Sequence, residues 1–299
     1  MIAAENILQI LEPIGRTIFV LTSVVLLGFF YGRFRPTDMR AINTLNTDVF
    51  IPALIFSVMA SKSFIIQEQI SLGLAATLVV LGSGLVVLPL CKYIGVHPKT
   101  FVPPMMFNNS GNLGLPLIIL ALGDNALSAA VTVFLVENTL HFVVGPYVMG
   151  SRPNPIQLLK QPMIAATVVG VIWSIYSVPI PGVVSISIEM LGQVAVPLLL
   201  FALGIRMNQV DFTHWKMGVW SAILAPLSGV VIAIPASFLF NLSNFETSVL
   251  ILFSVLPPAV LNYVVAERFN QEPESVAAIV LIGNIGSLLI IPLTLLFII

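Results

Sequence analysis

Two short segments of the sequence place polar residues and proline inside long apolar runs. They are 107–116, with three asparagines and two glycines, and 256–263, with two prolines and one asparagine. Unsatisfied polar groups are costly in hydrocarbon, so these residues must line a cavity or pack against protein. Proline removes an amide donor and clashes with the preceding turn, so we expect each segment to interrupt a helix. The candidate substrate-binding residues are Asn108, Asn109, Asn112, Pro257, Pro258 and Asn262.

The chemistry that such breaks offer is the binding of a negative charge. The N-terminus of a half-helix carries partial positive charge and free N–H groups, which suit a carboxylate. Neither segment contains Lys or Arg, which favours an anion held by dipoles and amides over one held by a salt bridge. The alternative is a pair of proline-kinked packing helices in which asparagine side chains join neighbouring helices.

Ionisable residues form a second candidate group in the apolar run 125–149. Glu137 and His141 are four residues apart and therefore share a helical face, and ionisable groups inside a membrane are functional hypotheses by default. They are candidates to carry a coupling proton or cation, together with Asn138 and Asn284. The alternative is a mutually satisfied structural pair. Catalytic zinc needs three protein ligands, so we predict no metal site and no cofactor.

The composition places the chain in a lipid bilayer. Of its 299 residues 58% are hydrophobic and 8% are charged, whereas soluble domains have about 25% charged residues. A spanning helix needs about 20 apolar residues, so the chain has room for about ten spans and for no soluble catalytic domain. The net charge of -1 and the absence of a basic run give no argument for nucleic acid. We therefore predict an all-α polytopic membrane protein.

The apolar runs, read against proline, glycine and charge, predict ten spans, near 13–32, 40–61, 69–93, 100–122, 125–149, 156–178, 184–206, 215–240, 246–267 and 274–299. One set of alternate loops collects most of the basic residues, namely Arg33, Arg35, Arg40, Lys92, Lys99, Arg152, Lys160, Arg206, Lys216 and Arg268. Basic loops stay on the inner side, which predicts a plasma membrane (bacterial inner membrane) protein with both termini outside. The N-terminus has no basic region or cleavage site of a secretory signal, so we expect the first span to be retained.

Matched residues divide the chain into two halves. Pairs 145 or 146 residues apart occupy equivalent spans, and they are Pro52 and Pro197, Pro89 and Pro235, Asn138 and Asn284, and Pro146 and Pro292. They predict a first five-helix repeat at 1–150, a linker at 151–154 and a second repeat at 155–299. Five is an odd number, so the second repeat must be inverted, as in many secondary transporters. The alternative is chance matching in a proline-rich membrane protein.

Several of these segments resemble the auxin efflux carrier family, which includes plant PIN-type carriers and bacterial permeases for malonate and malate. The most specific likeness covers 256–270 and 291–296, and nearly the whole chain takes part. Weaker matches are Asn43 with 50–56, 195–197 with 202–204, and Asn109 with 114–116.

The resemblance implies that broken helices 4 and 9 cross, that spans 1, 2, 6 and 7 form a scaffold, and that spans 3–5 and 8–10 form a mobile transport domain. It also implies a homodimer that works by an elevator motion. Two departures concern the site. Asn108 and Asn262 stand where the plant carriers have prolines, and Glu137 with Asn138 replaces an uncharged pair, which leaves room for ion coupling.

The preferred hypothesis is a secondary transporter of small organic anions, meaning auxin-, malonate- or malate-like carboxylates, with H⁺ or Na⁺ as a possible coupling ion. The alternative within the same architecture is a sodium-coupled symporter of the bile-acid type. An enzyme is not expected, because no nucleophile and base or metal cluster converges in the sequence. A ligand sensor would need an output domain, which the short loops cannot house.

Overall fold

The computed structural model of the chain describes residues 2–35, 39–61, 64–151, 160–176, 178–208 and 214–298. All regular structure in these ranges is helical, apart from one isolated β-bridge. Seven of the described helices are long and apolar enough to cross a membrane. The predicted all-α, polytopic membrane class is therefore confirmed. Residues 152–154 of the predicted linker lie outside the described residues.

The helices of the first half are α1 (Ile2–Phe34), α2 (Met39–Leu45), α3 (Ile51–Met59), α4 (Ile66–Ile94), α5 (Pro98–Met106), α6 (Leu115–Leu122) and α7 (Leu127–Val148). Two π-helical turns, η1 (Asn46–Phe50) and η2 (Ser110–Gly114), precede α3 and α6, and a 3₁₀ turn, η3 (Asp124–Ala126), precedes α7. The second half contains α9 (Pro162–Tyr176), α10 (Gly182–Arg206), α11 (Trp215–Leu239), α12 (Asn244–Ser254), α13 (Leu261–Arg268) and α14 (Pro273–Ile298).

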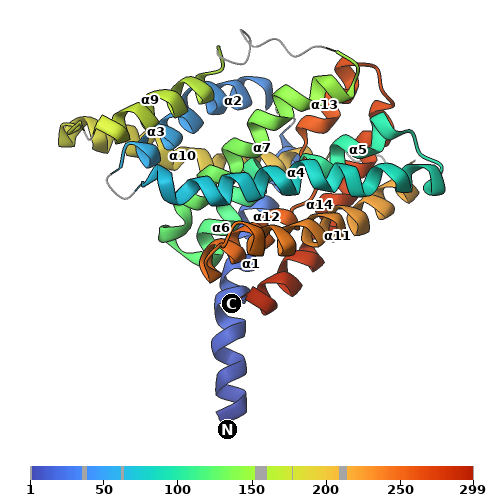
Figure 1. Ribbon diagram of the computed structural model, residues 1–299, viewed down its shortest axis with the longest axis horizontal. Helices are drawn as coiled ribbons and strands as arrows, with labels where there is room; N and C mark the ends of the chain where they lie inside the picture. Colours follow the sequence, from blue (N-terminus) through green and yellow to red (C-terminus); the bar gives the residue numbers. More distant parts are fainter. Residues whose placement is uncertain are drawn as a thin grey trace.

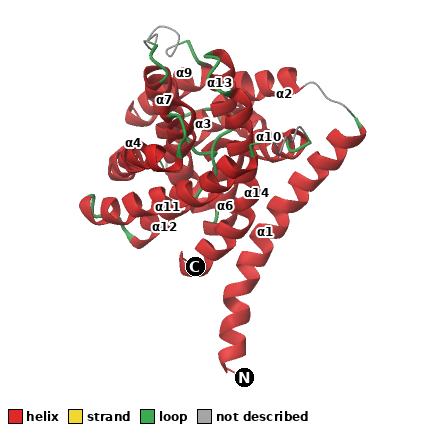
Figure 2. Cartoon of the chain, turned by 90° about the vertical axis from the view of Figure 1, so that its right-hand side faces the viewer, coloured by secondary structure: helices red, strands yellow, loops and turns green. Residues whose placement is uncertain are grey.

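Three of the ten predicted spans are not continuous long helices. The fourth is divided into α5 and α6, the ninth into α12 and α13, and the sixth is the short helix α9. The first span is longer than predicted, because α1 has 33 residues, about 50 Å at 1.5 Å per residue. Its N-terminal turns extend beyond the rest of the molecule (Figures 1 and 2). The count of ten spans and the inversion of the halves remain predictions.

Alternate loops gather at opposite ends of the molecule. At one end the Lys99 Nζ donates to the Met149 carbonyl at 3.3 Å, and the Gln271 Nε2 donates to the Thr100 Oγ1 at 2.9 Å. The segments that follow α4, α7 and α13 therefore lie together. At the other end, residues at the starts of α4, α7 and α12 line one cavity of about 650 Å³. This alternation agrees with the predicted segregation of the basic loops, while the outward orientation of the termini remains a prediction.

The helices pack in two groups. In one, α10 packs against α1 and α3, and α3 packs against α9. In the other, α11 packs against α4, α12 and α14, while α4 also contacts α5 and α7, and α13 contacts α14. In Figure 1, α4 and α11 run side by side across the second group. The division into a scaffold and a mobile transport domain remains a prediction, because α6 contacts α1 and α10 as well as α7.

The contact between α1 and α10 depends on two glycines. A Cβ atom at Gly28 would overlap the carbonyl oxygen of Phe201, and one at Gly204 would overlap the carbonyl oxygen of Val25. Small residues allow the backbones of membrane helices to approach closely. The two helices therefore cross with almost no side chain between them at these positions.

We predict that Gly28→Ala lowers the apparent melting temperature of the purified protein. The added methyl group meets backbone atoms, which cannot move aside as a side chain can, and such overpacking costs about 1–3 kcal/mol. Gly15→Ala is the matched control, because a Cβ at Gly15 in the same helix meets nothing within 4 Å. Equal melting temperatures for the two variants would contradict the close crossing.

Candidate functional site

The break in the fourth span lies at 107–109. Helix α5 begins at a His97 cap, whose Nδ1 accepts from the Lys99 amide at 3.2 Å, and it ends at Met106. Phe107 is extended, with φ -101° and ψ 99°, and the chain becomes helical again at Ser110. The predicted interruption at this polar segment is thus present.

The break in the ninth span is caused by two consecutive prolines. Helix α12 begins at a capping box formed by Ser243 and Glu246 and ends at Ser254. A residue before proline disfavours the helical conformation, and neither Pro257 nor Pro258 has an amide hydrogen to donate. Helix α13 starts three residues after the second proline, at Leu261.

The two breaks cross and pair with each other. The Asn109 amide donates to the Pro257 carbonyl at 2.6 Å, and the Ala259 amide donates to the Phe107 carbonyl at 3.0 Å. These bonds form a short antiparallel bridge between Asn108 and Pro258. Each broken segment therefore supplies hydrogen-bond partners to backbone groups of the other. Non-helical backbone at membrane depth requires such partners, because no water is present to replace them.

Two of the predicted substrate-binding asparagines hold this crossing together. The Asn108 Nδ2 donates to the Phe253 carbonyl at 2.7 Å, and the Asn262 Nδ2 donates to the carbonyls of Phe107 and Ala259 at 2.8 and 3.0 Å. Both side chains are buried. Their amide donors are used by backbone oxygens, in agreement with the alternative in which asparagine joins packed helices.

Asn284 connects both breaks to α14. Its Oδ1 accepts from the Asn109 Nδ2 at 3.0 Å, while its own Nδ2 donates to the Pro258 and Val280 carbonyls at 3.1 and 2.7 Å. The sequence predicts Asn284 to be one of the coupling residues. In the structure it lies at the crossing, 175 residues away in sequence from Asn109.

Hydrogen-bond donors without acceptors lie at the start of the second half-helix of the fourth span. The amides of Ser110, Gly111 and Asn112 have no acceptor among the described residues, nor does the half-buried Asn112 side chain. On the other break the amides of Val260 and Leu261 are likewise free within the described part of the chain. Two half-helices thus begin beside each other with unused donors and partial positive charge.

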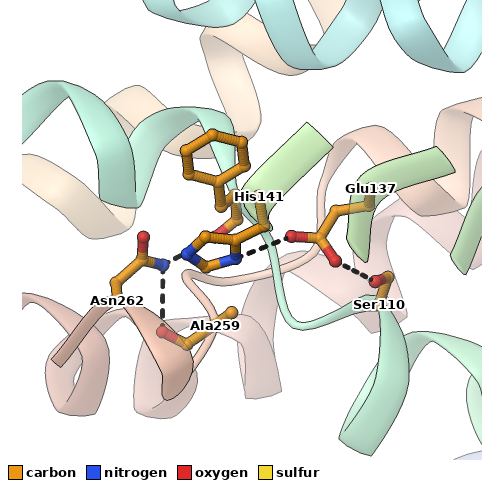
Figure 3. A network of polar contacts seen from close by, with 6 residues as sticks. Ser110, Glu137, His141, Ala259 and Asn262 are labelled. Atoms are coloured by element: carbon orange, nitrogen blue, oxygen red, sulfur yellow. Dashed lines mark hydrogen bonds and ion pairs between the residues drawn. The ribbon is translucent and has the colours of Figure 1, made fainter. Parts of the chain in front are cut away.

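The Glu137 carboxylate connects α7 to the same crossing (Figure 3). Its Oε2 accepts from the Ser110 hydroxyl at 2.8 Å, and its Oε1 lies 3.2 Å from the His141 Nδ1. The His141 ring stacks on Phe107, with centroids 4.2 Å apart and an interplanar angle of 11°. Glu137 is 3% exposed and His141 2%, so this is a buried, paired carboxylate.

Asn138 and the described lysines and arginines take little part in the crossing. Asn138 is half-buried and takes no part in the Glu137 hydrogen bonds, although it was grouped with them in the sequence. In the described residues no lysine or arginine is bonded to the crossing, and no group of three or more His, Cys, Asp or Glu is placed to hold a metal ion. The polar groups at the crossing are therefore amides, hydroxyls and one acid–imidazole pair.

An apolar cavity of about 240 Å³ lies beside the crossing. Its walls come mainly from α1, α10 and α14, with Leu113 from η2, and Asn284 and Ser287 are among its few polar residues. Sequence reasoning missed this cavity, because the residues of α1 and α10 that line it are ordinary apolar membrane residues. Only the contact between the two helix groups brings them to Asn284.

Residues 151–295 match the model of a family described as membrane transport protein. The second half of the chain thus matches this family. The resemblance noted in the sequence, to the family that includes the auxin efflux carriers, is thereby confirmed.

Two similar proteins span most of the length of this membrane transport protein, and a third matches about half of it. An uncharacterized transporter of Methanocaldococcus jannaschii is 22% identical over 92% of this chain and 96% of its own. A protein of Rhizobium meliloti, provisionally named a malonate transporter, is 25% identical over 88% of this chain and 89% of its own. Auxin efflux carrier component 6 of Arabidopsis thaliana is 25% identical over 47% of this chain and 25% of its own.

We predict that Asn262→Ala lowers the apparent melting temperature whereas Asn112→Ala leaves it nearly unchanged. Asn262→Ala removes two hydrogen bonds to buried carbonyls, and an unsatisfied buried group costs about 1–3 kcal/mol. Asn112→Ala makes the same chemical change where no hydrogen bond is lost. Thermal unfolding in detergent measures both variants, and a larger loss for Asn112→Ala would refute this division of roles.

Proposed function

We propose that this membrane transport protein carries small organic anions, with the carboxylate bound at the crossing of the two breaks. The observation that supports this most is the group of unused amide donors at the starts of two adjoining half-helices. Such N-termini bind anions through N–H groups and the helix dipole. The names of the Rhizobium and Arabidopsis relatives, a malonate transporter and an auxin carrier, agree with an organic anion.

In this proposal the carboxylate of the substrate is held by the Asn112 side chain and by the amides around Gly111. The Asn109 side chain, which is bonded to Asn284, helps to position these donors. Asn112 is the best-placed side chain because its amide is not used by the fold. Asn108 and Asn262 shape the site by holding the backbone and contact the substrate less. Pro257 and Pro258 contribute by interrupting the helix, which leaves the amides of the following residues without helical partners.

Transport would occur by alternating access between the two helix groups. The group of α1, α3, α9 and α10 would be the scaffold, and the group that contains the crossing would move against it. We propose a homodimer formed through the scaffold, as the family resemblance implies. Val169, Ile172, Ile186 and Met190 of α9 and α10 are among the large exposed apolar side chains that would face lipid or the partner. The plasma membrane is the proposed location.

We predict that Asn112→Ala weakens binding of the carried carboxylate about ten- to a hundred-fold, since losing a hydrogen bond to a charged group costs about 1.5–3 kcal/mol. Uptake into proteoliposomes, measured for a panel of mono- and dicarboxylates, identifies the anion and gives its half-saturating concentration. Ser228→Ala serves as the control, because it removes a buried hydroxyl of α11 that is bonded to the Ala225 carbonyl and takes no part in the proposed carboxylate contacts. Unchanged transport by folded Asn112→Ala protein would place the site elsewhere.

The Glu137 carboxylate is the proposed proton or cation switch. It touches both sides of the first break, through Ser110 and through His141 stacked on Phe107. A change in its charge would therefore be felt at the start of the half-helix that is proposed to bind the substrate.

We predict that Glu137→Gln preserves folding and anion binding but alters the dependence of transport on pH or Na⁺. Glutamine keeps the shape and an oxygen for the Ser110 hydroxyl while it removes the charge and the titration. Uptake rates with and without a pH gradient or Na⁺ test this. If the variant and the original protein respond identically to both, the acid–imidazole pair is structural.

A further inference from the structure

A second, smaller cavity lies behind the break in the ninth span. Its volume is about 10 Å³, and its walls come from α11, α14 and the segment 255–258. A cavity of about that size accommodates one water-sized particle. It is separate from the 240 Å³ cavity, although both have Ser287 in the wall.

One hydroxyl group in this cavity is without a partner. Ser221 of α11 is 0% exposed, and its Oγ has no hydrogen bond among the described residues. Two other buried serines of the same helix, Ser228 and Ser237, donate to carbonyls three residues earlier. Buried polar groups nearly always have a partner, and an exception calls for an explanation such as an unseen ion or water.

The residues around Ser221 supply further oxygen atoms. The Val255 carbonyl accepts no hydrogen bond within the described chain, because Pro258 has no amide hydrogen and the Ala259 amide donates to Phe107. The Ala222 carbonyl loses its helical partner in the same way, since residue 226 is proline. Ser287 donates its hydroxyl to the Asn284 carbonyl at 2.6 Å, which leaves its lone pairs free.

The electrostatic potential at this point favours a positive ion. Helix α12 ends at Ser254, and the C-terminal end of a helix carries partial negative charge. A Cβ at Gly229 would overlap the Ser254 carbonyl, so α11 closes directly over this end. The cavity wall contains no lysine, arginine or histidine, and no carboxylate.

We propose that this cavity binds one dehydrated Na⁺ ion, coordinated by the hydroxyls of Ser221 and Ser287 and the carbonyls of Val255 and Ala222. Neutral oxygen ligands without a carboxylate suit a monovalent ion, because Ca²⁺ sites use carboxylates and Mg²⁺ keeps several waters. Unwound backbone carbonyls and half-helix C-terminal ends are a known means of holding Na⁺ at broken helices. The ion site lies on the carbonyl side of the break, whereas the proposed anion site lies on the amide side.

The site would link a cation to the geometry of the crossing. An ion bound to the Val255 carbonyl fixes the backbone two residues before Pro257, whose own carbonyl accepts from the Asn109 amide. This inference does not depend on which anion is carried, and Na⁺ binding is measurable without any substrate.

The test uses the purified full chain in detergent without substrate. Its apparent melting temperature and its binding of radioactive ²²Na⁺ are measured while NaCl replaces choline chloride or KCl at constant ionic strength. We expect Na⁺ to raise the melting temperature more than K⁺ or choline. Ser221→Ala should raise the half-saturating Na⁺ concentration about ten-fold or more, since one ligand is lost.

Two controls make the result specific. Ser228→Ala changes an equally buried serine of α11 and should keep the Na⁺ response, and Ser287→Ala should weaken it as a second ligand. Without Na⁺, Ser221→Ala should be at least as stable as the original protein, because an unpartnered hydroxyl is removed. A Na⁺ response that is absent, or equal in Ser221→Ala, overturns the proposal and leaves water as the occupant. A response lost in Glu137→Gln but kept in Ser221→Ala places the ion at Glu137 and also overturns it.

Discussion

A backbone amide or carbonyl that faces hydrocarbon without a partner is costly, and two helices of this protein stop inside an apolar span. The segments around Asn108 and Pro258 meet that constraint jointly, because each supplies the partner that the other lacks. The positions of four half-helices follow from this one antiparallel contact. So do the places of the donors and acceptors that remain unused.

Proline makes the two sides of the crossing chemically different. Pro257 and Pro258 remove two donors, so the ninth span has more carbonyls than amides. The Asn108 Nδ2 supplies one of the missing donors, to the Phe253 carbonyl. Helices that begin at the crossing have the opposite imbalance, with amides in excess. Sites for opposite charges can therefore lie on two sides of one break without any lysine, arginine or metal ion.

The sequence predicted the elements that depend on local rules. Apolar length predicted the membrane class, proline with clustered asparagine predicted both breaks, and the four-residue spacing predicted that Glu137 and His141 meet. The sequence did not predict which residues far apart in the chain are hydrogen-bonded to each other. The bond from Ser110 to Glu137 and the bond from Asn109 to Asn284 depend on how separate helices pack, and no periodicity encodes that. Ser221 resembles any other membrane serine until its surroundings are known.

Asn284 is bonded to both breaks at once, and this restricts how α14 is able to move. Hydrogen bonds tolerate only a few tenths of an ångström beyond about 3.2 Å, and a one-residue slide along a helix is about 1.5 Å. Such a slide would break the bonds from Asn284 to Asn109 and Pro258 together. The apolar contacts around them are not directional and allow small displacements. The polar centre of the protein therefore has one register, whereas the apolar contacts around it do not by themselves fix the position of a helix along its axis.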